Sequence, residues 1–228
     1  MDVVSREQPQ ARAEFIKKTY THLAGAVGAF IVLETFLIQS GIAAGLTQAL
    51  SGSRYSWLAI LAGFSLLGWL SRELAAKADS VSLQYSGLAL YVVTEAVLFA
   101  PLIFTANTLY DPTIVPTAGI ITSLMFAGLT AVAFTTGKDF TFLGGALKIG
   151  GCVAIGMIIC SAIFGFTLGL FFSIAMVAFA MAAILYDTSK IMHHYTKDQY
   201  VAASLELFAS VALLFWYVIR ILMSFSRR

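Results

Sequence analysis

Long apolar stretches, separated by short polar connections, fill almost the whole sequence. Each stretch has roughly the 20 residues that an α-helix needs to cross the hydrocarbon core of a bilayer. Because a backbone in lipid must satisfy its own hydrogen bonds, we expect each stretch to form one helix. The pattern therefore predicts an all-α integral membrane protein, a seven-transmembrane-helix bundle with spans at about residues 19–39, 56–74, 83–104, 117–134, 143–164, 167–186 and 200–223.

The connections between the apolar stretches are short. The fifth and sixth stretches meet almost at once around Gly165, which predicts a tight antiparallel hairpin. Asp111-Pro112 and Pro116 mark another brief connection, and residues 136–139 form a polar turn. The polar residues 1–15 lack the apolar core of a cleavable signal peptide, so we expect them to be retained. We predict a short N-terminal segment at 1–15 and a single transmembrane domain at 16–228.

Composition supports the bilayer as the main solvent of this protein. Hydrophobic residues make up 59% of the sequence and charged residues 11%, whereas a soluble domain is nearer half apolar and a quarter charged. The formal net charge is +2, which is too small to indicate nucleic acid as a partner. We therefore expect the lipid bilayer to be the principal partner.

The distribution of Lys and Arg predicts the orientation, because cytoplasmic loops carry the excess of these residues. With the N-terminus in the cytoplasm, the outer loops contain only Arg54. Seven crossings then leave Arg227 and Arg228 outside; the alternative is a last segment that re-enters and returns to the cytoplasm. We expect a multi-pass inner-membrane protein with a cytoplasmic N-terminus, and its cytoplasmic basic residues are Arg6, Arg12, Lys17, Lys18, Arg72, Lys77, Lys138, Lys190 and Lys197.

Four charged residues lie near the cytoplasmic ends of the predicted spans. A charge at the bilayer centre costs at least about 2.5–3.5 kcal/mol, so each charge within a span needs a reason. Asp187 closes the sixth span and Glu206 opens the seventh, while Arg72 ends the second and Lys148 lies near the start of the fifth. These residues can form an ion network in which Arg72 or Lys148 is a latch that protonation of the acids releases. The alternative is that both bases extend to the headgroups and Asp187 is a solvated helix end.

Two further acids lie inside predicted spans. Glu95 is in the middle of the third span, where a side chain reaches the headgroups least easily. It is either protonated or paired, with His22 of the first span or with a backbone group, and we count it with Asp187 and Glu206 as a candidate for an ion pathway or for proton sensing. Glu34 lies in the outer half of the first span, where it can reach water.

Motifs for catalysis or metal binding are missing from the sequence. An intramembrane aspartyl protease needs Gly-x-Gly-Asp on the helix after Tyr186-Asp187, and this motif is absent, as are Gly-x-Ser-x-Gly and His-Glu-x-x-His. The seventh span lacks the lysine of a retinal protein. His193 and His194 are adjacent, so their side chains point in different directions. We therefore expect no enzymatic activity, no catalytic residues, no cofactor and no metal site.

The end of the sixth predicted span carries the most specific motif. Residues 184–191 read Ile-Leu-Tyr-Asp-Thr-Ser-Lys-Ile, which resembles the signature segment of the Bax-inhibitor-1-like family, also called the transmembrane Bax inhibitor motif family. Residues 15–20, Glu95 with Ala100-Pro101, and residues 126–144 resemble other parts of that family. The resemblance thus runs from about Phe15 to the C-terminus, and it implies a seven-helix bundle with the last helix near the centre.

The resemblance also implies a function. Some bacterial members are pH-sensitive calcium leak channels, in which the aspartate matching Asp187 faces a second aspartate on the last helix and the pair senses protons. Here the second position is Phe208 or Ser210, depending on the alignment, and neither is acidic. Glu206 lies one helical turn before Ser210 and can face Asp187 from a different height.

These considerations leave two hypotheses. The first is a bacterial membrane protein that leaks Ca²⁺ or H⁺ in response to pH, with Asp187 as the sensor. The second follows from the missing second aspartate: a branch of the family lacks it and modulates a membrane-embedded ATP-dependent protease. In that case the protease is the partner and no ion is transported.

Overall fold

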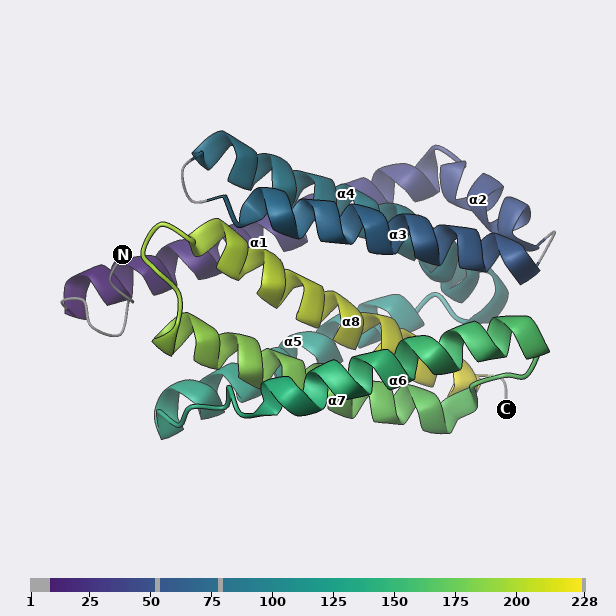
Figure 1. The fold of residues 1–228 in the computed structure, drawn as a ribbon. Helices are drawn as coiled ribbons and strands as arrows, with labels where there is room; N and C mark the ends of the chain where they lie inside the picture. The colour runs from purple at the N-terminus through teal and green to yellow at the C-terminus, as the bar shows by residue number, and fades with distance from the viewer. Residues whose placement is uncertain (1–8, 52–53, 78–79, 227–228) are drawn as a thin grey trace.

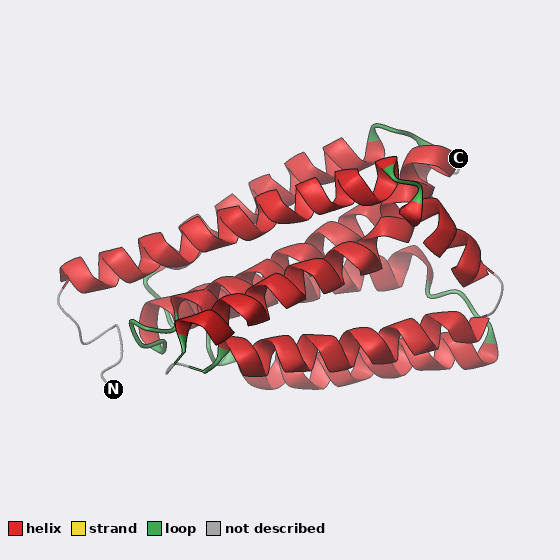
Figure 2. Ribbon diagram, turned by 90° about the horizontal axis from the view of Figure 1, so that it is seen from above, coloured by secondary structure: helices red, strands yellow, loops and turns green. Residues whose placement is uncertain are grey.

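The computed structural model describes residues 9–51, 54–77 and 80–226. Seven of its helices are long and apolar enough to cross a membrane, which confirms the predicted fold class. The long helices run roughly along one common direction (Figures 1 and 2). In chain order the elements are α1 (Pro9–Gln39), α2 (Ile42–Ser51), α3 (Arg54–Ala75), α4 (Val81–Thr105), a π-helical turn η2 (Ala106–Tyr110), α5 (Ile114–Thr136), α6 (Leu143–Phe164), α7 (Gly169–His193) and α8 (Tyr200–Ser226).

Helix α8 lies at the centre of the bundle. It packs against α7, α1, α5, α4 and α3, and Figure 1 shows it crossing between the α3–α4 pair on one side and α5 and α7 on the other. It is one continuous helix, and it ends at the opposite end of the bundle from the start of α1. This agrees with seven crossings rather than with a last segment that re-enters.

The helix boundaries differ from the prediction in three places. Helix α1 begins at Pro9, so residues 9–15 are helical, and Phe15 is buried against Tyr195 with ring centroids 6.4 Å apart. The short helix α2 occupies a stretch expected to be a connection, and its Ala43 and Leu50 are buried. Helix α7 continues to His193, seven residues beyond the predicted end of the sixth span.

The predicted hairpin between the fifth and sixth spans is confirmed. Helix α6 ends at Phe164, and Gly165 caps it with φ +76°, a left-handed conformation that glycine adopts at little cost. The Ser161 hydroxyl donates to the Phe166 carbonyl at 2.6 Å and supports the turn. Helices α6 and α7 consequently run antiparallel beside each other (Figure 1).

Burial distinguishes the helices that face protein from those that face lipid. In α4, 61% of the residues of the most apolar window are buried, whereas in α6 only 6% are. Large apolar side chains of α6 such as Ile149, Val153 and Ile155 are exposed. Because exposed apolar surface of this extent is favourable only in an apolar solvent, the outer faces of these helices contact the lipid bilayer.

Candidate functional site

Asp187 and Ser210 form a buried contact between α7 and α8. The Ser210 hydroxyl donates to Asp187 Oδ2 at 2.5 Å, and both residues are 7% exposed. Helix α7 continues for six residues beyond Asp187, so this residue is not a solvated helix end, and that part of the alternative is wrong. Of the two positions considered for the second aspartate of the family, the structure places Ser210, not Phe208, opposite Asp187.

Arg72 lies in the last turn of α3 and faces the same region. Its Nε is 3.6 Å from Glu206 Oε1 on α8, and Nη2 donates a long hydrogen bond of 3.5 Å to the Tyr91 hydroxyl. Its guanidinium carbon lies 5.3 Å from the centroid of the Tyr91 ring. The side chains of Arg72 and Glu206 are 45% and 32% exposed. An ion pair that is this exposed and this long is weak and can open at low cost.

Glu95 belongs to the same cluster. It lies one helical turn after Tyr91 on α4 and is 4% exposed, and its carboxyl interacts with the Tyr91 hydroxyl and with the charge of Arg72. His22 is not its partner: its Nε2 lies 2.6 Å from the Tyr85 hydroxyl and its Nδ1 lies 2.7 Å from the Lys18 carbonyl oxygen. The pairing of Glu95 with His22 is therefore wrong.

Of the two proposed basic latches, the structure brings Arg72 to the acids. Arg72 interacts electrostatically with Glu206, Glu95 and Asp187. Lys148 is exposed on α6 and takes part in none of the ion pairs formed by the described residues. The acids and Arg72 come from four helices, α3, α4, α7 and α8, which explains why the sequence predicted an ion network but could not decide between Arg72 and Lys148.

Two residues near the cluster were not among the candidates. Lys190, one turn after Asp187, interacts electrostatically with it, and the Lys190 ammonium lies 5.1 Å from the centroid of the Tyr195 ring. Tyr195 is buried in the loop after α7. Burial raises the pKa of the Tyr195 hydroxyl far above its usual range, and the negative charges of Glu206 and Asp187 raise it further. The i, i+3 spacing from Asp187 was the one signal in the sequence for Lys190.

Glu34 is also placed differently from the prediction. It is 5% exposed and continues the buried face of α1, and neither of its carboxyl oxygens has a hydrogen-bond partner among the described residues. The expectation that Glu34 reaches water is therefore wrong. His194, in contrast, lies outside the spans, with Nε2 3.3 Å from Asp139 Oδ2.

The bundle and its buried acid cluster define a multi-pass helical membrane protein. Residues 12–227 match the sequence profile of the family described as "Bax1-I: Inhibitor of apoptosis-promoting Bax1", and the chain belongs to this family, as its motifs suggested.

Relatives occur in bacteria and in animals. An uncharacterized protein of Campylobacter jejuni is 30% identical over an alignment of 238 positions, which covers 94% of this chain and 90% of that protein. An uncharacterized protein of Pseudomonas aeruginosa is 36% identical over 109 residues (47% and 49%), and protein lifeguard 4 of Mus musculus is 32% identical over 130 residues (53% and 51%). The chain thus spans about half the length of the last two relatives.

Proposed function

We propose that this protein is a pH-sensitive leak channel for Ca²⁺ or H⁺, and not an enzyme, in a bacterial inner membrane with the N-terminus in the cytoplasm. The orientation rests on the excess of Lys and Arg in the loops at the N-terminal end. The transport activity rests on ionisable groups within the bundle, because such groups are costly in a membrane and usually mark an ion or proton pathway.

The contact between Asp187 and Ser210 carries this proposal. A serine hydroxyl can donate to a carboxylate and can equally accept from a carboxylic acid. The pair therefore keeps a hydrogen bond in both protonation states of Asp187, and a proton can come and go without leaving a buried polar atom unsatisfied. This is the property required of a proton sensor.

The Arg72–Glu206 pair supplies the second part of the proposed switch. Arg72 bridges α3 to α8 and also contacts α4 through Tyr91. Protonation of Asp187 or Glu95 changes the negative charge around Arg72 and so biases the position of its guanidinium. Among the described residues no three acids converge on one metal site, so we propose that Asp187, Glu206 and Glu95 offer Ca²⁺ the oxygen ligands that it prefers one after another along a pathway.

One observation favours the alternative, modulation of a membrane-embedded ATP-dependent protease. The partner of Asp187 is a neutral serine rather than a second acid, so the contact also suits a permanent link between α7 and α8. In that case the cluster stabilises the bundle, and the function belongs to its outer surface.

The test is Ca²⁺ entry into dye-loaded proteoliposomes across roughly pH 6 to 8. Wild type is compared with Asp187→Asn and with the matched control Asp198→Asn, whose side chain is exposed in the loop before α8. We expect a pH-dependent flux in wild type and in the control, and a flux without pH dependence in Asp187→Asn. Removal of the proposed latch by Arg72→Gln is expected to raise the flux at the higher pH.

Two results would count against the channel. Flux no greater than that of empty liposomes would move the assignment to the protease modulator, which is then tested by co-purification with the protease and by slower turnover of its substrates. A flux whose pH response is the same in wild type and Asp187→Asn would remove Asp187 as the sensor.

A further inference from the structure

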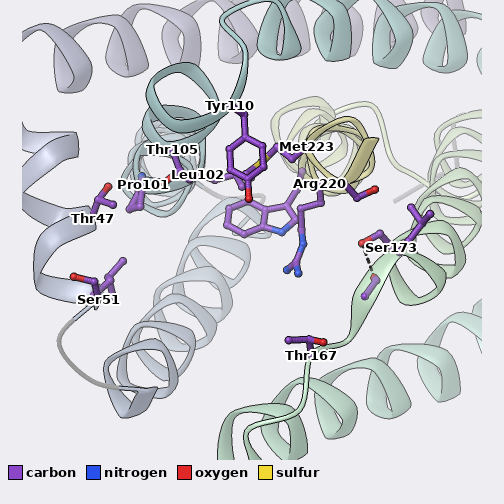
Figure 3. Close-up of a pocket in the computed structure, with 15 residues that line it drawn as sticks. Thr47, Ser51, Pro101, Leu102, Thr105, Tyr110, Thr167, Ser173, Arg220 and Met223 are labelled. Carbon is purple, nitrogen blue, oxygen red and sulfur yellow. Dashed lines mark hydrogen bonds between the residues drawn. The ribbon is translucent and has the colours of Figure 1, made fainter. Parts of the chain in front are cut away.

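A large cavity lies at the end of the bundle where α4 and α8 end and α7 begins, away from the Asp187 cluster (Figure 3). Its volume is about 560 Å³, within the range of roughly 300–1,000 Å³ typical of small-molecule sites. Residues of α2, α4, η2, α7 and α8 line it, together with Thr167 in the loop before α7.

Arg220 gives this cavity a positive charge. Its side chain extends from α8 into the space between Tyr110, Thr167 and Ser173 (Figure 3). No carboxylate of the described residues lies within 4 Å of the guanidinium. Arginine is always charged in proteins and presents a planar fork of donors that fits phosphate. A partly buried guanidinium loses part of its hydration, and an anion that enters the cavity and pairs with it compensates for that loss.

The start of α7 adds a second positive element on the facing wall. Gly169 and Leu170, the first residues of this 25-residue helix, line the cavity. The residue before them, Leu168, makes no side-chain capping bond, and the first turn contains no acid. The first amide N–H groups of the helix and its dipole are therefore available to an anion. The Ser173 hydroxyl is not, because it donates to the Gly169 carbonyl at 3.3 Å.

The remaining lining is divided between hydroxyls and apolar side chains. The hydroxyls of Thr105 and Thr167 make no hydrogen bond with the described residues, so both are available as donors. The apolar part is formed by Leu50, Pro101, Leu102, Leu170, Trp216 and Met223. Such a lining accommodates a molecule with an anionic head and an apolar body, and suits a small hydrated ion less well.

The depth of Arg220 along α8 favours an amphiphile of the membrane itself. Arg220 lies six residues before the end of α8, or about 9 Å at 1.5 Å per residue. The headgroup regions add about 5–8 Å on each side of the hydrocarbon core, so Arg220 lies close to their inner border, and basic side chains near helix ends reach toward the headgroups.

We propose that this cavity binds an anionic phospholipid, with its phosphate between Arg220 and the start of α7 and its first acyl carbons against the apolar wall. The site is independent of the proposed channel activity. It lies at the opposite end of the bundle from the Arg72–Glu206 pair, and its test measures lipid binding rather than flux.

The test is native mass spectrometry of the delipidated full-length protein in detergent, titrated with dioleoylphosphatidylglycerol or with the zwitterionic dioleoylphosphatidylcholine. We expect tighter binding of the anionic lipid to wild type. Arg220→Gln is expected to weaken it about tenfold, the effect of losing one charge-assisted hydrogen bond. Arg220→Lys is expected to fall in between. The control Lys148→Gln removes the same charge from an exposed position on α6 and is expected to bind as wild type does.

Equal binding of the two lipids by wild type would overturn the proposal, and this result needs no variant to fold. Equal loss of binding in Lys148→Gln and Arg220→Gln would also overturn it, because the effect would then come from net charge. Inorganic phosphate is titrated in a separate arm. If millimolar phosphate raises the melting temperature of wild type but not of Arg220→Gln and displaces the lipid, the ligand is a soluble anion and the lipid assignment is wrong.

Discussion

The substitution Gly87→Ala tests the closest approach of two helices beneath the candidate site. Gly87 lies in α4 where that helix meets the end of α3. A Cβ atom at this position would lie 2.5 Å from the Ser71 carbonyl oxygen, 2.6 Å from the Ala75 backbone nitrogen and 3.1 Å from the Ala75 Cβ. The first two atoms belong to a helix backbone, so they cannot rotate away, and the helices must separate.

The distances around Gly87 set the size of the expected loss of stability. Ordinary contacts of a Cβ atom begin at about 3.4 Å, so α3 and α4 must move apart by roughly 1 Å at this point. Overpacking of this kind typically costs about 1–3 kcal/mol. Alanine offsets about 1 kcal/mol of it through its higher helix propensity. We therefore expect the free energy of unfolding to fall by at most about 2 kcal/mol in Gly87→Ala, and to lie about 1–3 kcal/mol below that of a glycine-to-alanine change without the clash.

The site should change together with the stability. Ser71 precedes Arg72, and Tyr91 lies one helical turn after Gly87 on α4. A separation of the two helices therefore lengthens the contact of Arg72 with Tyr91, now 3.5 Å. We expect the pH response of ion flux to change in Gly87→Ala, because Arg72 is no longer held against α4.

The assay is the apparent melting temperature in detergent, compared with Gly128→Ala. A Cβ at Gly128 on α5 would meet no atom within 4 Å, so this control keeps the gain in helix propensity without the clash. At roughly 2–4 °C per kcal/mol for a chain of this size, we expect Gly87→Ala to melt several degrees below Gly128→Ala, and no decrease for Gly128→Ala relative to wild type. A melting temperature of Gly87→Ala equal to or above that of Gly128→Ala would refute the reasoning.

Three further predictions concern single residues. Glu34→Leu should raise the melting temperature, because it removes two buried oxygens without hydrogen-bond partners among the described residues. An unsatisfied buried group costs about 1–3 kcal/mol. A decrease would show that the Glu34 carboxyl has a bound partner. Phe15→Ala should reduce the free energy of unfolding by about 3–5 kcal/mol, and so the melting temperature, because it removes the buried ring beside Tyr195. A melting temperature unchanged within error would show that residues 9–15 pack loosely. Hydrogen bonds from Thr141 lower the pKa of Asp139, so the stability that the Asp139 carboxylate contributes is complete above the unfolded pKa of 3.8 and is lost as pH falls through the lower folded pKa. Asp139→Asn should therefore reduce the melting temperature at pH 7 and have no such effect in acid. An equal effect at both pH values would contradict this.

Part of the candidate site was visible in the sequence. Asp187, Glu206, Glu95 and Arg72 stood out because each is a charged residue in or beside an apolar span, and the structure brings all four together. Their partners were not visible. Neither Ser210 nor Tyr91 is unusual in a membrane helix, and His22 and Lys148, which looked equally suitable, point elsewhere.

The number of spans, the hairpin at Gly165 and the family could all be predicted from the amino-acid sequence alone. Transfer of a side chain from water to lipid depends on that residue and its neighbours along the chain, so a linear pattern is sufficient. The contact of Ser210 with Asp187 and the position of Arg220 in a cavity beside α7 became visible only in the folded bundle. Successive residues of a helix differ in direction by about 100°, so the rotation and sliding of one helix against another decide which side chains meet. Those quantities are set by the packing of all the helices together.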